Sequence, residues 1–251
     1  MIYFYDLIHE LVLRDLKLRY RRSVLGLLWT LLNPLVQLLV LNLIFSLVLP
    51  LSIPNYTIFL FTGLLAWNWF QASLYSGTGS IVDNRELIRR PGFPTTVLPV
   101  VTVVSYFIHF LLALPILFIF MLLSGIQVSS AFLILPVIFA IQFFLILGLI
   151  YFTAAIQVTF RDTQYLLGVL LFLGFYLTPI FYDSSAIPSQ MQTLYYLNPM
   201  VTIIEAYRSV FMYGEFPASL PLMLVGLASI VIFWITFRVF KHASYHFVEE
   251  L

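Results

Sequence analysis

Long apolar runs alternate with short polar connections along most of the chain. Six runs stand out, near residues 25–49, 56–80, 96–123, 131–158, 164–182 and 219–240. A bilayer has a hydrocarbon core about 30 Å thick, so a helix that rises about 1.5 Å per residue needs roughly 20 apolar residues to cross it. The pattern therefore predicts six transmembrane helices joined by mostly short connections.

The segment before the first run, residues 1–22, mixes apolar and basic positions at helical spacing, and its basic residues include Arg14, Lys17, Arg21 and Arg22. This pattern predicts an amphipathic helix at the cytoplasmic membrane surface. Two interpretations stay open. The helix only anchors the chain and sets its topology, or its basic residues also recognise anionic lipid headgroups or a cytoplasmic partner.

The stretch 198–214 is apolar but short. Asn198 suits a helix N-cap, Pro199 the first turn and Gly214 the end, which leaves about 14 residues and too little length to cross a bilayer. With the segment before it, this stretch predicts an external re-entrant helical hairpin over residues 184–214. Glu205 and Arg208 lie one turn apart there, so we expect them to pair with each other, to pair across a dimer, or to hold a polar face at headgroup level.

Composition agrees with a membrane protein. The 251 residues are 62% hydrophobic and 9% charged, with a mean hydropathy of +1.02, so we expect a single all-α integral membrane domain over residues 1–251. The net charge of +1 gives no support to a nucleic-acid partner. The chain has no cysteine, which excludes disulfides and thiolate catalysis.

The positions of the basic residues predict the orientation. Eleven of the twelve Lys and Arg residues fall on one side of a six-span chain. Because basic residues in short loops are retained in the cytoplasm, we expect a multi-pass protein of the cytoplasmic membrane with both termini cytoplasmic.

The connection between the second and third runs, residues 83–94, carries the most regular polar pattern. Asp83 and Glu86 have capping-box spacing, and Glu86 and Arg90 have the i,i+4 spacing of a helical ion pair. The pattern predicts a short capped cytoplasmic helix. It is either an ordinary positively charged loop or a rigid lever on which a cytoplasmic protein pushes, with Arg85, Glu86 and Arg89 as contacts.

Aromatic residues are concentrated within two of the apolar runs. Trp67 flanks Asn68 and Gln71 near the middle of the second run, and helical spacing in the fifth run relates Phe172, Phe175, Tyr176 and Tyr182. One explanation is structural: the aromatic residues pack between helices or contact lipid, and the amides form polar contacts between helices. The alternative is a glycan path, because aromatic faces suit the apolar faces of sugar rings.

Several kinds of chemistry lack their usual residues. None of the six runs contains an Asp, Glu or Lys for a proton relay, no glycine is followed by lysine as a phosphate-binding loop requires, and the four histidines are dispersed. We therefore expect no enzyme activity, no metal site and no cofactor bound by this chain. If transport is powered, another subunit binds the ATP and Mg²⁺.

The chain resembles the type-2 ABC exporter permeases that move lipid-linked polysaccharides, among them O-antigen, teichoic-acid and capsule exporters. The resemblance covers nearly the whole chain and rests on "LVLRDLKLRYRRSVLGLLWTLLNPL", "NRELIRRPGFP" and "YLTPIFYDSSAIP…YLNPMVTIIEAYRSVFMYG". It implies a homodimer bound to two cytoplasmic nucleotide-binding ATPase subunits, with a channel for lipid-linked polysaccharide at the dimer interface.

The resemblance also implies roles for particular residues. The ATPase subunit would contact Asn84, Arg85, Glu86, Arg89, Arg90 and Phe93, the N-terminal helix would border lipid-headgroup entry, and residues 185–214, including Glu205, Tyr207 and Arg208, would form the external gate. Three alternatives remain: an exporter of drugs or small lipids, an unpowered channel or scaffold, and a membrane-embedded enzyme.

Overall fold

The computed structural model describes residues 2–20, 26, 28–48 and 51–250, and these residues form helices and loops. The α-helices are α1 Ile2–Tyr20, α2 Leu28–Leu43, α3 Tyr56–Gly79, α4 Arg85–Ile88, α5 Val97–Leu123, α6 Leu135–Thr159, α7 Thr163–Leu177, α8 Ser189–Tyr196, α9 Pro199–Arg208, α10 Ser219–Ala243 and α11 Phe247–Glu250.

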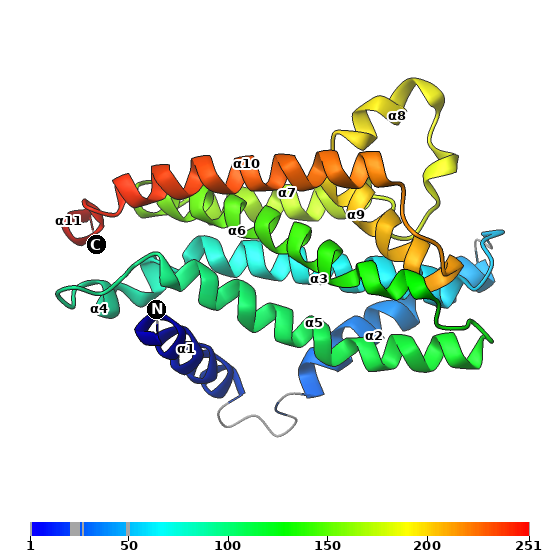
Figure 1. Cartoon of the computed structure of the whole chain (residues 1–251), viewed down its shortest axis with the longest axis horizontal. Helices are drawn as coiled ribbons and strands as arrows, with labels where there is room; N and C mark the ends of the chain where they lie inside the picture. The colour runs from blue at the N-terminus through cyan, green and yellow to red at the C-terminus, as the bar shows by residue number, and fades with distance from the viewer. Residues whose placement is uncertain (1, 21–25, 27, 49–50, 251) are drawn as a thin grey trace.

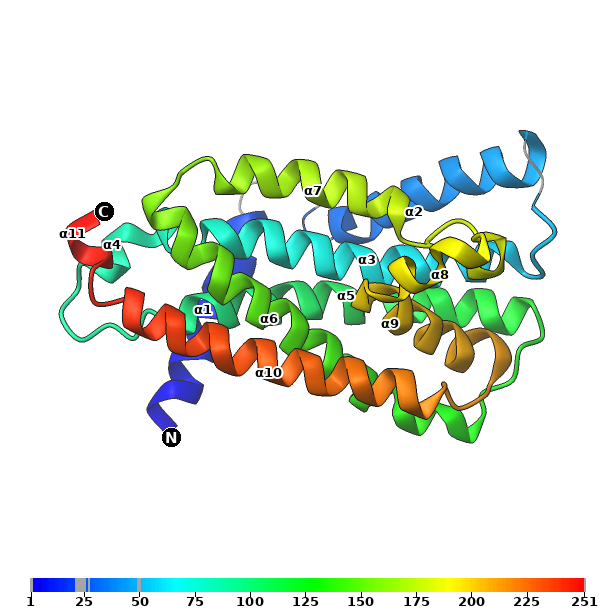
Figure 2. The ribbon, with the colours of Figure 1, turned by 90° about the horizontal axis from the view of Figure 1, so that it is seen from above.

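The long helices run side by side along the longest axis of the molecule (Figure 1). Helices α4 and α11 lie at one end, together with both chain termini, whereas α8 and α9 lie toward the other end (Figures 1 and 2). Helix α3 packs against α2, α5, α6, α7 and α9, so it runs through the centre of the bundle. Most of its side chains are buried, which fits a helix that is apolar on nearly every face.

Each of the six apolar runs contains a helix, and the chain is a multi-pass membrane protein. Among the described residues, four helical segments have the length and composition to cross a bilayer: Leu28–Ser46, Val97–Leu123, Ser130–Thr159 and Ser219–Ala243. Helix α3 has 24 residues, and α7 is a shorter apolar helix.

The fifth run was predicted to be helical to residue 182, but α7 ends at Leu177. Pro179 explains the difference, because a proline disfavours helical backbone at the residue before it. Thr178 has φ −98° and ψ 136°, which is extended. The 15 residues of α7 span about 22 Å, less than the hydrocarbon core.

The capped helix predicted in residues 83–94 is only partly formed. Helix α4 has four residues, and the side chain of its N-cap Asn84 makes no capping hydrogen bond. The predicted Glu86–Arg90 pair is wrong. Arg90 lies beyond the last helical turn, and no ion pair joins it to Glu86, both of which are described residues.

Helix α1 packs across α5 through a small apolar cluster. Val12 of α1 is buried against Val97 and Val101 of α5. Phe4 and Leu18 of the predicted apolar face remain exposed. The helix is therefore docked on the bundle by part of its apolar face.

Candidate functional site

Aromatic side chains from α3, α7 and the segment after α7 form one continuous set, which we call the aromatic surface. Trp67 and Phe175 have ring centroids 6.3 Å apart. Tyr176 lies 5.3 Å from both Phe172 and Phe175, and Phe181 lies 5.1 Å from Tyr182 and 5.9 Å from Phe175. The aromatic surface therefore comprises Trp67, Phe172, Phe175, Tyr176, Phe181 and Tyr182.

The aromatic surface runs from the interior of the bundle to its outside. The Trp67 side chain is buried, whereas Phe172 is 59% and Tyr176 52% exposed. The structure brings together all five aromatic residues that the sequence suggested for a glycan path. Phe181 was missed because its position lies off the helical spacing that relates Phe172, Phe175, Tyr176 and Tyr182.

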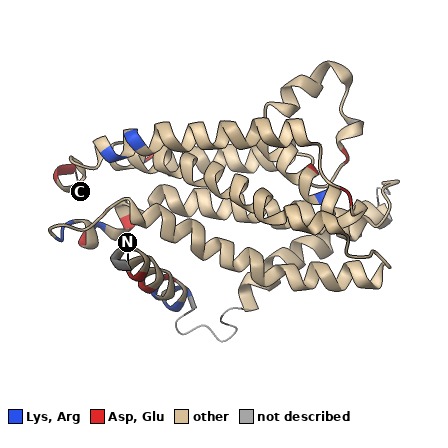
Figure 3. Ribbon diagram, viewed as in Figure 1, with Lys and Arg blue, Asp and Glu red and all other residues tan. Residues whose placement is uncertain are grey.

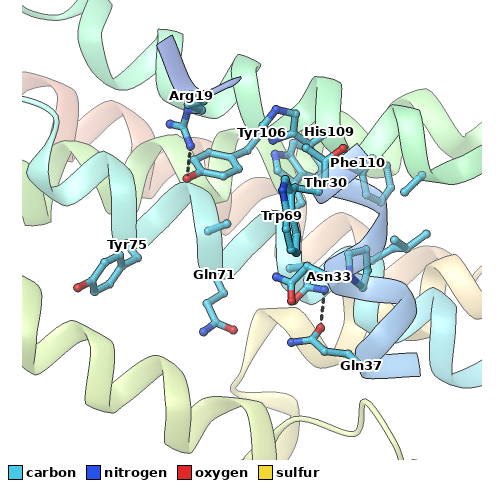
Figure 4. Close-up of a pocket in the computed structure, with 16 residues that line it drawn as sticks. Arg19, Thr30, Asn33, Gln37, Trp69, Gln71, Tyr75, Tyr106, His109 and Phe110 are labelled. Atoms are coloured by element: carbon cyan, nitrogen blue, oxygen red, sulfur yellow. Dashed lines mark hydrogen bonds between the residues drawn. The ribbon is translucent and has the colours of Figure 1, made fainter. Parts of the chain in front are cut away.

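A polar pocket of about 470 Å³ lies between α1, α2, α3 and α5 (Figure 4). Asn68 donates to Gln37 at 2.9 Å, and Trp67 Nε1 donates to Gln71 Oε1 at 2.7 Å. Asn68, Gln71 and Gln37 also line the pocket. These amide side chains therefore have two roles. They hydrogen-bond to other side chains within α3 and between α3 and α2, and they line the polar pocket.

Arg19 lines the same pocket, although the sequence analysis did not select it. Its guanidinium bonds to Asp15 at 2.8 Å, to Ser76 at 3.4 Å and to the Tyr106 hydroxyl. Burial alone would lower the pKa of Arg19, but Tyr106 and Asp15 raise it above its usual value. Arg19 thus links α1 to α3 and α5 as a permanent cation.

Helix α9 was expected to lie in the outer leaflet with one polar face, but it is buried in the bundle on both faces. Arg208 is only 4% exposed and Thr202 is also buried. The Tyr207 hydroxyl donates to Gln142 Oε1 at 2.8 Å, and Gln142 donates to the Ala66 carbonyl at 2.8 Å. The three helices α9, α6 and α3 are therefore joined by a buried hydrogen-bonded chain.

The expected pairing of Glu205 with Arg208 within the chain is not formed. Arg208 donates to the carbonyls of Pro179 and Ile180, each at 2.7 Å, and Glu205 accepts from the Tyr196 hydroxyl at 3.2 Å. Side chains three residues apart can meet, but these two point toward different partners. The side chain of Asp183, in the nearby loop, lies close enough that Arg208 helps to lower its pKa, against burial, which raises it.

The residues suggested for contact with an ATPase lie at the end of the molecule opposite α9. The side chains of Arg85, Glu86, Arg89 and Arg90 are exposed. Asn84 and Phe93 are half-buried, and Asn84 donates to the Ser80 carbonyl at 2.9 Å. The charged residues therefore form an accessible group, whereas Asn84 holds the local fold.

Two of the four basic residues suggested for lipid contact can be placed. Arg14 and Lys17 are exposed on α1, and Arg21 and Arg22 lie outside the described residues. Within the described part of the chain, no group of three or more His, Asp or Glu side chains could hold a metal ion.

Residues 6–212 match the protein family described as "ABC-2 type transporter". The chain belongs to the ABC-2 type transporter family. The resemblance inferred from its motifs is therefore confirmed, and as an ABC-2 permease the chain is a transport subunit without its own ATPase site.

Several curated ABC-2 relatives cover nearly the whole chain. The O-antigen export system permease protein RfbA of Myxococcus xanthus is 38% identical over 98% of this chain and 95% of its own length. A protein of the same name from Klebsiella pneumoniae is 32% identical over 99% of this chain and 96% of its own. The polysialic acid transport protein KpsM of Escherichia coli is 23% identical over 93% of this chain and 92% of its own.

Proposed function

We propose that this ABC-2 chain is the membrane subunit of an ATP-driven exporter that moves lipid-linked polysaccharide of the O-antigen type across the cytoplasmic membrane. The observation that carries this proposal is the 38% identity, over nearly the full length of both chains, to a protein named an O-antigen export permease. The aromatic surface supports it, because ring faces in a membrane protein can receive sugar rings.

The proposed topology has six spans within one domain, residues 1–251, and both termini in the cytoplasm. Its support is the grouping of basic residues on α1, α4 and the end of α10, toward one end of the molecule (Figure 3). Residues 184–214 then form the external re-entrant hairpin. Helix α9 and the π-helical turn Ser209–Tyr213 that continues it extend over at most about 22 Å, which is shorter than the hydrocarbon core.

The proposed assembly is a homodimer with two cytoplasmic ATPase subunits that bind ATP and Mg²⁺. The exposed charges Arg85, Glu86, Arg89 and Arg90, with Phe93 beside them, offer the ATPase an accessible surface. The outward-facing side of α7 has many exposed apolar and aromatic residues, which suits a channel wall or a dimer interface.

Substitution of the aromatic surface tests the proposed path. In cells that make the polysaccharide but lack its exporter, the chain is co-expressed with the ATPase that co-purifies with it, and glycan at the cell surface is measured. Phe175→Ala with Tyr176→Ala should reduce export at least about tenfold, because one ring stacking on a sugar is worth about 1 kcal/mol or more. Assembly with the ATPase should be unchanged.

The matched control replaces Phe152, an exposed aromatic residue of α6 outside the aromatic surface, by alanine. Export by this variant should equal that of the wild type. Normal export by the Phe175/Tyr176 variant would refute the aromatic path, and absence of glycan export by the wild-type complex would refute the proposed substrate.

A further inference from the structure

Arg208 is a buried cation whose hydrogen bonds all go to backbone carbonyls. It donates to Pro179 and Ile180 at 2.7 Å and, at 3.5 Å, to Phe59, and its guanidinium carbon lies 3.4 Å from the centroid of the Phe59 ring. No carboxylate of the described residues lies within 4.0 Å of it. It is therefore not one half of an ion pair with any described residue of this chain.

The two carbonyls that Arg208 contacts at 2.7 Å, those of Pro179 and Ile180, belong to the bend after α7, residues 178–181. The Thr178 carbonyl accepts from the Ile180 N–H at 2.7 Å. Because this backbone is irregular and Pro179 has no N–H, the other carbonyls of the bend need donors from elsewhere. Arg208 donates to the carbonyls of Pro179 and Ile180. The Tyr56 hydroxyl donates to a third carbonyl, that of Phe181, at 2.8 Å. A cation just beyond the C-terminal end of α7 also complements the negative end of that helix.

The site suits a guanidinium specifically. A planar fork can donate to two successive carbonyls while its face lies on an aromatic ring, which a lysine ammonium cannot do. Helix α3 leaves room for the fork at Gly63. A Cβ built there would lie 3.0 Å from both Arg208 Nη2 and the Ile180 carbonyl oxygen.

The bend carries two members of the aromatic surface, Phe181 and Tyr182. Phe181 follows directly after the two bonded carbonyls, and its ring lies 6.1 Å from that of Tyr176. The Tyr182 hydroxyl, one residue further, donates to the Tyr176 carbonyl at 3.1 Å. If the bend moved away from α9, both rings would leave their places.

We propose that Arg208 is a positioning residue for transport: from inside the bundle it fixes the bend after α7 and thereby the places of Phe181 and Tyr182 on the aromatic surface. It does so through donated hydrogen bonds and touches no substrate. The link to export rests on the proposed function, whereas the structural role does not.

The structural role is tested with the purified protein, because the cysteine-free chain allows single cysteines to be introduced. Ile180→Cys reports on the bend and Ala154→Cys, in α6, reports on the bundle; both native side chains are fully buried. We measure the rate of maleimide labelling at each cysteine. Arg208→Gln and Arg208→Lys should speed labelling at residue 180 about tenfold or more, since buried carbonyls lose their donors, and should leave residue 154 unchanged.

The matched control is Arg238, an exposed arginine whose guanidinium carbon lies 3.9 Å from the Trp234 ring centroid. Arg238→Gln and Arg238→Lys should change labelling at neither cysteine. Gly63→Ala provides a second variant that displaces the fork without removing it, and it should act as Arg208→Gln does. Unchanged labelling at residue 180 in Arg208→Gln and Gly63→Ala would overturn the proposal, as would equal acceleration at residues 154 and 180.

The link to transport is tested by glycan export in cells. Arg208→Lys and Arg208→Gln should both lose at least about tenfold in export, because the fork and not the charge alone is needed. Normal export by Arg208→Lys would overturn the positioning role. Normal export by Arg208→Gln together with faster labelling at residue 180 would overturn it as well. Failure of the wild-type complex to export glycan would refute the proposed function, and the labelling rates would still decide the structural role.

Discussion

At the scale of single residues, buried polar side chains of this protein join helices that are far apart in the sequence. Tyr207, Gln142 and the Ala66 carbonyl form one such chain across α9, α6 and α3. The sequence selected Tyr207 only through the resemblance, as part of the external gate. It could not predict the hydrogen-bonded chain, because the partners of Tyr207 come from positions 65 and more residues away.

Removal of the Tyr207 hydroxyl should destabilise the protein. Tyr207→Phe keeps the ring but leaves Gln142 Oε1 buried without its donor, which costs about 1–3 kcal/mol. For a chain of this length, each kcal/mol lowers Tm by about 2–4 °C. Thermal unfolding in detergent measures the change, with Tyr213→Phe, at an exposed residue, as the control. A Tm equal to that of the wild type would show that the bond contributes nothing.

The same scale shows how much of the candidate site the sequence could predict. The aromatic residues at helical spacing on the fifth apolar run do gather on one surface, because spacing fixes the face of a helix on which side chains lie. The partners of Glu205 and Arg208 could not be predicted. Their proximity in sequence suggested a pair, but in the structure buried backbone carbonyls compete for the guanidinium, and only the three-dimensional fold places them there.

At the scale of elements, the existence of the helices was predicted better than their ends. The apolar runs located the long helices because burial in lipid requires long apolar helices with few charges. The fifth apolar run was extended through Pro179, because apolar residues lie on both sides of this proline. Helix α4 is shorter than predicted for a different reason. The side chain of its N-cap, Asn84, makes no capping hydrogen bond. The side chain of its last residue, Ile88, is buried in the core.

The exposed charges of α4 lead to a prediction about the ATPase. Arg89→Glu reverses one charge of an accessible group and should weaken binding of the ATPase subunit at least about tenfold. Like charges that face each other across an interface repel, and charges at the rim of an interface control the association rate. Co-purification and a binding titration with the isolated ATPase measure this. Lys241→Glu, an exposed reversal at the end of α10, should bind normally. Equal affinities of wild type and Arg89→Glu would exclude Arg89 from the contact.

At the scale of the whole molecule, the distribution of charge predicts the orientation in the membrane. Arg208 is the exception among the twelve basic residues, and the structure explains why it does not contribute to the topology signal: it is buried and bonded to carbonyls. The other basic residues of the described chain lie on α1, near α4, on the turn before α7 and toward the end of α10. A basic cluster of this kind is retained in the cytoplasm.

The proposed orientation predicts which ends of the molecule a reagent can reach in intact cells. Single cysteines replace Ser185, in the loop before α8, and Tyr245, beyond α10; both native residues are exposed. A maleimide that reaches the outer face of the cytoplasmic membrane but does not cross it should label residue 185 at once and residue 245 only after the membrane is permeabilised. If the hairpin were a seventh span, both residue 245 and Arg238 would lie outside. Labelling of residue 245 before permeabilisation would therefore refute the six-span topology.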